Sequence, residues 1–221
     1  MILLRDYKGL KFPDEYIVRF FFKESLHSHP GKVLELGCAN GNNLQLFYQH
    51  GFAVTGVDLS EERVSQARHN FSALSGNGLD PAGFTFVHED MLSYLERDEN
   101  TYDVVLLPSS LYYLDESGID RVLRKVRRNM KPGTRFFLRM RTPEDYRCGK
   151  GVQLSPRSWR LTIAETGERD CTVTCYRKEE FEVILSSLWK PVRTCWCKCR
   201  FDNPQNGVLV TNDDFIVWGE V

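Results

Sequence analysis

Short apolar runs alternate with amphipathic stretches along most of the chain. The first run, KVLEL at 32–36, precedes a glycine-containing loop and a helical pattern over 42–51. The succession then repeats, with strands predicted at 52–60, 83–90, 102–110 and 134–140 and helices at 60–76, 90–100 and 117–133. Strands that alternate with helices predict an α/β fold, in which helices cover both faces of a parallel sheet.

Both ends of the chain have a different pattern. A helix is predicted over 11–29, because Pro13 and two acids, Asp14 and Glu15, stand where a first turn favours them. After the fifth strand, residues 141–158 indicate a loop and 159–177 a pair of strands around a TGE turn. A helix at 178–189 and two final strands, 192–201 and 213–221, complete the predicted elements, with the turn at 202–207.

Composition narrows the class of protein. With 221 residues and a net charge of −1, nothing global points to nucleic acid or to an anionic membrane. The apolar start is too short for a signal peptide, and no apolar run reaches the roughly 18 to 20 residues of a membrane span. Seven cysteines, an odd number, are interpreted as reduced thiols. We therefore expect a cytoplasmic protein.

The loop after the first strand contains two glycines, Gly37 and Gly41, and lacks the third glycine of a dinucleotide fingerprint. It is a poor cradle for a pyrophosphate. Acids surround it: Glu35 precedes the loop, Asp58 ends the second strand and Asp90 follows the third. Carboxylates attract a cationic ligand and repel phosphate, so the pattern favours a nucleoside with a positively charged, phosphate-free tail.

On these residues the chain resembles the class I, Rossmann-like methyltransferases that use S-adenosylmethionine, of the small-molecule type. The first motif of the family is matched by Glu35, Leu36, Gly37 and Gly41, and its later acids by Asp58 and Asp90. Asp103 with VVLLP, Ser109 and Ser110 matches the fourth-strand motif, and MKPGTRFFL is typical of the turn into the fifth strand. The resemblance covers about residues 30–142.

The resemblance implies a doubly wound, mostly parallel seven-stranded sheet in the order 3-2-1-4-5-7-6. Its last strand is antiparallel, and a β-hairpin is inserted after strand 5. One domain, 1–221, is expected, made of an N-terminal helical cap (1–30), a cofactor-binding core (31–142), a loop and hairpin insertion (143–177), and a last helix with the final strand pair (178–221).

The resemblance also implies the cofactor, S-adenosyl-L-methionine, with S-adenosyl-L-homocysteine as the product. The expected cofactor contacts are Tyr16, Glu35, Gly37, Cys38, Asn40, Gly41, Asn42, Asp58, Leu59, Asp90, Met91, Leu107, Pro108 and Ser109. Two of these have open alternatives. Asp90 could be only the cap of the helix that it precedes, and Glu35 could support the loop instead of a ligand.

The acceptor side is less defined. Tyr113 and His88 are the candidate catalytic residues, and Tyr112, Arg139, Arg141 and Arg147 the candidate substrate contacts. Relatives often carry a histidine in the place of Tyr112 or Tyr113, so a histidine base is not expected there. The alternatives are an aromatic residue packed under a helix and a solvated loop whose arginines pair with Glu144, Asp145 and Glu168.

Two further clusters are assigned structural roles. The basic positions of RVLRKVRR, at helical spacing, indicate a solvated helix face. The alternating cysteines of CWCKC, residues 195–199, lie on one face of a strand, whereas zinc sites usually bend the chain between paired ligands. No metal is expected.

The sequence thus predicts methyl transfer to an oxygen or nitrogen of a small acceptor, possibly anionic, sugar-like or a natural product, by a monomer or homodimer. The alternatives are an RNA or protein methyltransferase, a nicotinamide oxidoreductase, and a non-catalytic binding protein of the same fold. A fused nucleic-acid-binding domain, excess positive charge and a membrane segment are all missing from the pattern.

Overall fold

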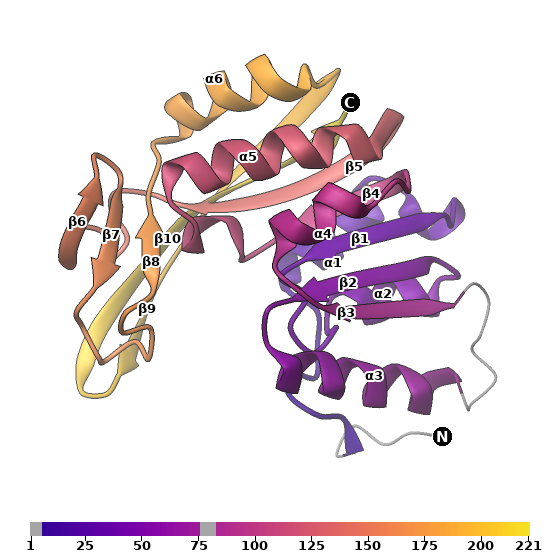
Figure 1. The fold of residues 1–221 in the computed structure, drawn as a ribbon, viewed down its shortest axis with the longest axis horizontal. Helices are drawn as coiled ribbons and strands as arrows, with labels where there is room; N and C mark the ends of the chain where they lie inside the picture. Colours follow the sequence, from indigo (N-terminus) through magenta and orange to yellow (C-terminus); the bar gives the residue numbers. More distant parts are fainter. Residues whose placement is uncertain (1–5, 76–82) are drawn as a thin grey trace. The chain divides into compact units, whose positions relative to one another are not determined.

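The computed structural model describes residues 6–75 and 83–221 (Figure 1). Its helices are α1 (Glu15–Lys23), η2 (Leu26–Ser28), α2 (Leu44–Gln49), α3 (Glu61–Ser75), α4 (Met91–Arg97), η3 (Leu111–Tyr113), α5 (Glu116–Val126), η4 (Arg127–Asn129) and α6 (Lys178–Trp189). Its strands are β1 (Lys32–Leu36), β2 (Ala53–Asp58), β3 (Phe84–His88), β4 (Tyr102–Leu107), β5 (Met130–Arg141), β6 (Gly151–Ser155), β7 (Ser158–Leu161), β8 (Thr172–Thr174), β9 (Arg193–Gln205) and β10 (Val208–Glu220).

Within the described residues, seven strands form one sheet in the order β3-β2-β1-β4-β5-β10-β9. β2 pairs in parallel with β1 and β3, and β1 pairs in parallel with β4, whereas β9 and β10 are antiparallel. Numbered within this sheet alone, the order is the predicted 3-2-1-4-5-7-6. The mostly parallel, doubly wound fold is confirmed.

The chain divides into two compact units, one within residues 1–107 and 128–137, the other within 108–127 and 138–221. β5 contributes residues to both. In the first unit α3 packs against β3 and β2, and α2 against β2 and β1. The strands β1 and β4 are almost wholly buried, which explains why they appear in the sequence as unbroken apolar runs.

α1 belongs to the first unit and is shorter than predicted. Asp14 is its N-cap, with a side chain that accepts a hydrogen bond from the Tyr16 amide, so Pro13 precedes the helix. Phe20 and Phe21 are fully buried, and the Phe21 ring lies edge-on to Phe47, 4.9 Å between centroids. This aromatic packing holds α1 on α2.

The second unit contains the insertion, which differs from the prediction. In its described residues a three-stranded antiparallel sheet, β6-β7-β8, replaces a simple hairpin. The predicted strand pair is present as β7 and β8, but β6 lies in the stretch expected to be a loop. The final hairpin is also longer than predicted, because its turn is only Asn206 and Gly207, both with positive φ.

Two other expectations change. Pro132 and Gly133, expected to end a helix, lie within β5, and α5 ends at Val126. Cys148 and Cys175, expected to be reduced, are joined by a disulfide, while the other five cysteines, all in described residues, are not disulfide-bonded. No helix in the described part of the chain combines the length and apolar character needed to cross a bilayer.

Candidate functional site

The glycine loop follows β1 and is held by backbone contacts to β2. Gly37 and Cys38 both donate to the carbonyl of Val57, at 2.7 and 3.1 Å. Gly37, Ala39 and Gly41 all have positive φ, which the two glycines adopt without strain. At Gly41 a side chain would also collide with the ring of Phe71 at 2.9 Å. The loop therefore depends on both glycines.

Asp58 stands at the end of β2, beside this loop. One of its carboxylate oxygens accepts from the Ala39 amide at 2.8 Å and the other from the Ser60 amide at 2.9 Å. A carboxylate has about four acceptor positions, so each oxygen retains capacity for a ligand hydroxyl. Leu59, next along the chain, is 72% exposed, which leaves an apolar surface beside the acid.

Glu35 is buried at the end of β1 and has an unusual set of contacts. The Asn43 amide donates to its Oε1 at 2.7 Å, whereas Oε2 is buried with no hydrogen-bond partner among the described residues. The pKa of Glu35 is raised to about 8, chiefly by burial and also by the nearby Asp58 and Asp14, against the lowering effect of the Asn43 hydrogen bond. A buried acceptor without a partner carries a desolvation cost that a ligand ammonium would remove.

Asparagine side chains near the loop hold the N-terminal segment, residues 8–14. Asn40 donates to the carbonyls of Lys8 and Leu10 at 2.7 and 2.8 Å, and Asn42 to the carbonyl of Phe12 at 3.0 Å. The side-chain amino groups of Asn40 and Asn42, both expected cofactor contacts, are thus already used within the chain. Asn43, which the sequence analysis did not select, accepts from the Asp14 amide and orients Glu35.

The remaining expected cofactor contacts take different positions. Asp90 caps α4, where its Oδ1 accepts from the Leu92 and Ser93 amides at 3.0 and 3.1 Å, as its structural alternative predicts. Met91 is the first residue of α4 and is half-buried. Cys38 is buried, and burial raises the pKa of its thiol well above the usual value, so it is a poor nucleophile. Tyr16 is half-buried, and the Arg19 guanidinium lies over its ring, 5.0 Å from the ring centre.

The end of β4 lies where the units divide. Leu107 is fully buried and closes β4, and Pro108 is buried after it. Ser109 is exposed and its hydroxyl donates to the Pro108 carbonyl at 2.6 Å. Asp103, at the other end of β4, has a structural role: it accepts from the Lys32 amide at 2.8 Å and pairs with Lys131 at 2.6 Å.

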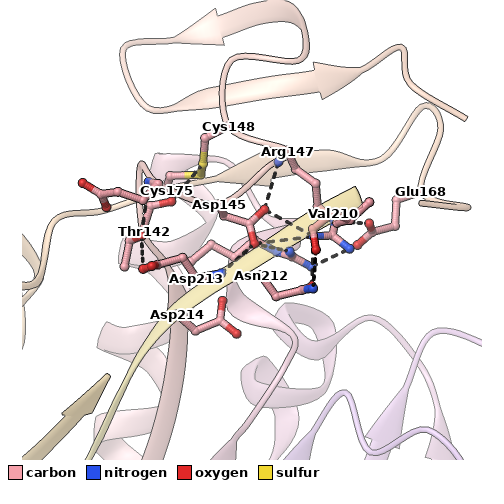
Figure 2. Close-up of polar contacts among 12 residues, drawn as sticks. Thr142, Asp145, Arg147, Cys148, Glu168, Cys175, Val210, Asn212, Asp213 and Asp214 are labelled. Atoms are coloured by element: carbon pink, nitrogen blue, oxygen red, sulfur yellow. Dashed lines mark hydrogen bonds and ion pairs between the residues drawn. A yellow bond between two sulfur atoms is a disulfide. The ribbon is translucent and has the colours of Figure 1, made fainter. Parts of the chain in front are cut away.

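Arginines and acids of the second unit form a dense cluster, which Figure 2 shows together with the disulfide. Arg141 contacts Asp145 and Glu168, both at 3.0 Å, and Arg147 contacts the same two carboxylates. Arg139 lies 3.9 Å from Asp214, whose pKa burial raises to about 6. The expected substrate contacts Arg141 and Arg147 thus pair with the acids that their alternative named, but they are buried and not in a solvated loop.

The two tyrosines after β4 join the same cluster. The Arg141 guanidinium lies 4.4 Å from the centre of the buried Tyr112 ring, a cation–π contact. The Tyr113 hydroxyl donates to Glu168 at 2.5 Å. Burial raises the pKa of Tyr113 well above the usual value, and the electrostatic effect of the adjacent Tyr112 raises it further. Tyr113 can therefore donate a hydrogen bond but is a poor general base.

His88 lies in the first unit, at the end of the edge strand β3. It is exposed, and its Nε2 is 3.1 Å from the Leu59 carbonyl, which fixes that nitrogen as the donor. Its register partner on β2 is Asp58. The contact orients His88 beside Leu59 and gives it a structural role there.

Comparisons with known proteins agree with this arrangement. Residues 33–133 match the methyltransferase domain family model. YqeM of Bacillus subtilis, which is named as a methyltransferase, is 31% identical over 103 residues. The match covers 46% of this chain and 39% of YqeM. An mRNA cap guanine-N(7) methyltransferase of Cryptococcus neoformans is 27% identical over 54% of this chain and 21% of its own length. This chain therefore covers less than two fifths of either curated relative.

A solved structure of a SAM-dependent methyltransferase from Methanosarcina mazei has the same fold. It superposes with a TM-score of 0.63 at 19% identity, over 86% of this chain and 92% of that one. The family match covers the glycine loop and all three acids, and the solved structure shares the sheet. Residues 33–133 thus match the methyltransferase domain family, and the chain has the fold of a solved SAM-dependent methyltransferase.

Proposed function

We propose that this protein transfers a methyl group from S-adenosylmethionine to an oxygen or nitrogen of a small-molecule acceptor. The observation that carries the proposal is the buried Oε2 of Glu35, which has no partner among the described residues. Dinucleotide sites would need further glycines and would place phosphate near these acids. A ligand with an ammonium group and no phosphate fits the acceptors and charges that are present.

Each residue of the first unit then has a specific task. Glu35 would bind the ammonium of the cofactor, Asp58 would accept from the ribose hydroxyls, and Leu59 with Met91 would pack against the adenine. S-adenosylmethionine supplies an electrophilic methyl group on a sulfonium sulfur. The chain's contribution is orientation, because in-line displacement depends mainly on aligning the acceptor atom with the methyl group.

The contacts of the arginines and of Tyr113 change which acceptor we expect. Because Arg141 and Arg147 already pair with Asp145 and Glu168, the reason for preferring an anionic acceptor is gone. Tyr113, whose hydroxyl proton is donated to Glu168, would orient an acceptor through the lone pairs of its hydroxyl oxygen. With Tyr113 a poor base, we infer that the acceptor atom is nucleophilic without assistance, as in a neutral amine or an acidic hydroxyl.

A second candidate substrate is RNA, favoured by the 27% identity to the cap guanine-N(7) methyltransferase over 54% of this chain. The net charge of −1 argues against it, because phosphate contacts usually require a basic surface. We further propose that the protein acts in the cytoplasm as a monomer or homodimer. Its five cysteines that are not disulfide-bonded support a reducing compartment, although one disulfide is present.

Calorimetric titration of S-adenosylhomocysteine tests the cofactor. We expect micromolar binding by the unaltered protein, and a loss of about one to two decades in Asp58→Asn, since a charge-assisted hydrogen bond contributes about 1.5–3 kcal/mol. Asp103→Asn is the matched control: it removes an acid from the same sheet that anchors only Lys32 and Lys131. No binding by the folded, unaltered protein would rule the proposal out.

Transfer of radiolabelled methyl from S-adenosylmethionine tests the acceptor. Incubation with cell extract, followed by separation into small molecules, RNA and protein, should place the label in the small-molecule fraction. Label in the RNA fraction, removed by ribonuclease, would support the second candidate instead. Binding of S-adenosylhomocysteine without label in any fraction would indicate a binding protein.

A further inference from the structure

A pocket of about 490 Å³ lies in the second unit, between the start of α6 and the middle of β9 and β10. Pockets of 300–1,000 Å³ are the usual size for small-molecule sites. Its lining shares no residue with the candidate cofactor site, and it includes Thr142, which Figure 2 shows beside the cluster around Arg141. Neither the proposed methyl transfer nor the cofactor accounts for it.

One wall of this pocket is aromatic and fixed in position. The rings of Trp196 and Phe215 are 5.7 Å apart, and Phe215 is almost fully buried. The Trp196 indole nitrogen donates to the Thr194 hydroxyl at 3.1 Å, which holds the indole plane. A flat apolar ring would find a rigid, preformed surface here, at little cost in side-chain entropy.

The rim carries positively and negatively charged side chains. Its two lysines already contact other groups of the protein. The Lys178 ammonium lies 5.2 Å from the Trp196 ring centre and 3.7 Å from Glu182. Lys198 lies 3.2 Å from the fully buried carboxylate of Asp213. These two cations therefore complete contacts within the protein and are poor candidates for a ligand anion.

The other charged side chains of the rim are exposed. They are one cation, Arg177, and two anions, Glu144 and Glu179. A guanidinium binds a carboxylate with two parallel hydrogen bonds, and a carboxylate pairs with an ammonium. The pocket thus offers an anion contact, a cation contact and an aromatic wall together. A ligand that is only anionic would meet the two glutamates, and one that is only cationic would meet Arg177.

We propose that this pocket binds a small zwitterion with a flat apolar ring, of the aromatic amino acid type. The ring lies against Trp196 and Phe215, the carboxylate meets Arg177, and the ammonium meets Glu144 or Glu179. The inference uses residues of the second unit alone and does not depend on the proposed methyl transfer.

Calorimetric titration of four probes into the full chain tests this site: L-phenylalanine, L-tryptophan, 3-phenylpropionate, which lacks the ammonium, and phenethylamine, which lacks the carboxylate. We expect both amino acids to bind at least tenfold more tightly than either singly charged analogue. Arg177→Ala and Trp196→Ala should each weaken phenylalanine binding about tenfold or more. Arg160→Ala, which removes an exposed arginine on β7 outside the pocket, should not.

A second measurement guards against a misfolded variant. The chain has four tryptophans, so ¹⁵N labelling gives up to four indole N–H signals, and the conservative Trp196→Phe identifies one of them. L-phenylalanine should shift that signal at the concentrations at which it binds. Equal affinity for all four probes, binding that Arg177→Ala leaves unchanged, or no shift of the Trp196 signal would each overturn the proposal.

Discussion

Asn43 donates a hydrogen bond to Glu35 at 2.7 Å and thereby fixes one carboxylate oxygen, while the other stays buried without a partner among the described residues. This relationship explains how a glutamate is kept inside a strand end that is otherwise apolar. The amide satisfies half of the carboxyl group, and burial keeps the proton on it near neutral pH. The other oxygen is left for a ligand, whose ammonium would favour loss of that proton on binding.

The pH dependence of the free energy of unfolding should reveal the raised pKa of Glu35. An unfolded chain loses this proton near pH 4.5, whereas the folded protein keeps it up to about pH 8. The contribution of Glu35 to the free energy of unfolding is therefore complete below about pH 4.5 and is lost as the pH rises through 8. Glu35→Gln should remove this loss, so the variant gains stability over the unaltered protein as the pH rises, by about 1.4 kcal/mol per unit at most.

Urea unfolding of both proteins at pH 5.5, 7.0 and 8.5 measures the difference. The same variant should bind S-adenosylhomocysteine about ten to a hundred times more weakly, since it cannot pair with an ammonium. A variant that is more stable at high pH and binds less separates a ligand role from a structural one. Parallel stability curves for the two proteins would show that Glu35 does not hold its proton.

The close approach of Cys38 to Gly56 predicts that a substitution at Cys38 partly compensates the loss of stability caused by a substitution at Gly56. A Cβ at Gly56 would lie 2.7 Å from the Cys38 sulfur and from the Phe86 ring. Gly56→Ala should therefore lower the free energy of unfolding by about 1–3 kcal/mol, the usual cost of overpacking. Adding Cys38→Ala should recover part of that loss, with Cys38→Ala alone as the control. Strictly additive losses in the double mutant would contradict the contact.

Glu168 links Arg141, Arg147 and Tyr113, so its neutralisation should be costly. Burial alone would raise its pKa, but Arg141, Arg147 and the Tyr113 hydroxyl together hold the pKa of Glu168 below its ordinary value. Glu168→Gln leaves two arginines facing one fewer acid, and should destabilise the protein by about 3–5 kcal/mol, as loss of one partner of a buried pair does. Thermal unfolding monitored by circular dichroism measures it. Glu182→Gln, an exposed acid on α6, is the control and should change stability by less than about 1 kcal/mol.

Thiol counting distinguishes the disulfide from the reduced state that the sequence suggested. Denatured without reductant, the protein should react with iodoacetamide at five cysteines, and after reduction at all seven. Mass spectrometry of the peptides should find Cys148 and Cys175 linked. Replacing both by serine should lower the free energy of unfolding by about 2–4 kcal/mol, given the length of the loop closed. Seven labelled cysteines without reductant would show that the bond is not formed.

Buried elements were predictable from the sequence because burial leaves a periodic signature. β1 and α6 have the bounds that the pattern gave, 32–36 and 178–189. β6 was missed because its residues are mostly exposed, so it has no apolar alternation and forms by pairing with β7. β9 continues past Cys199 through Pro204, which an edge strand tolerates but which the pattern indicated as a turn.

The candidate site was predictable where motif spacing determines position and not where contacts are long-range. Glu35, Gly37 and Asp58 lie together because parallel strands end at one edge of the sheet. That Asn43 would hold Glu35, or that Arg141 would stack on Tyr112, depends on side chains brought together by folding. Nothing in their sequence separation indicates these contacts.

The asparagines that hold residues 8–14 bind carbonyl groups of that segment, at Lys8, Leu10 and Phe12, and ignore its side chains. Every amino acid offers such a carbonyl. Apart from Gly9, where a side chain would lie 2.9 Å from Asn40, and Asp14, which caps α1, the segment can therefore change its side chains during evolution and still be held in the same place. Related chains should keep the asparagines while their N-terminal residues diverge, so sequence comparison alone would overlook the segment's role.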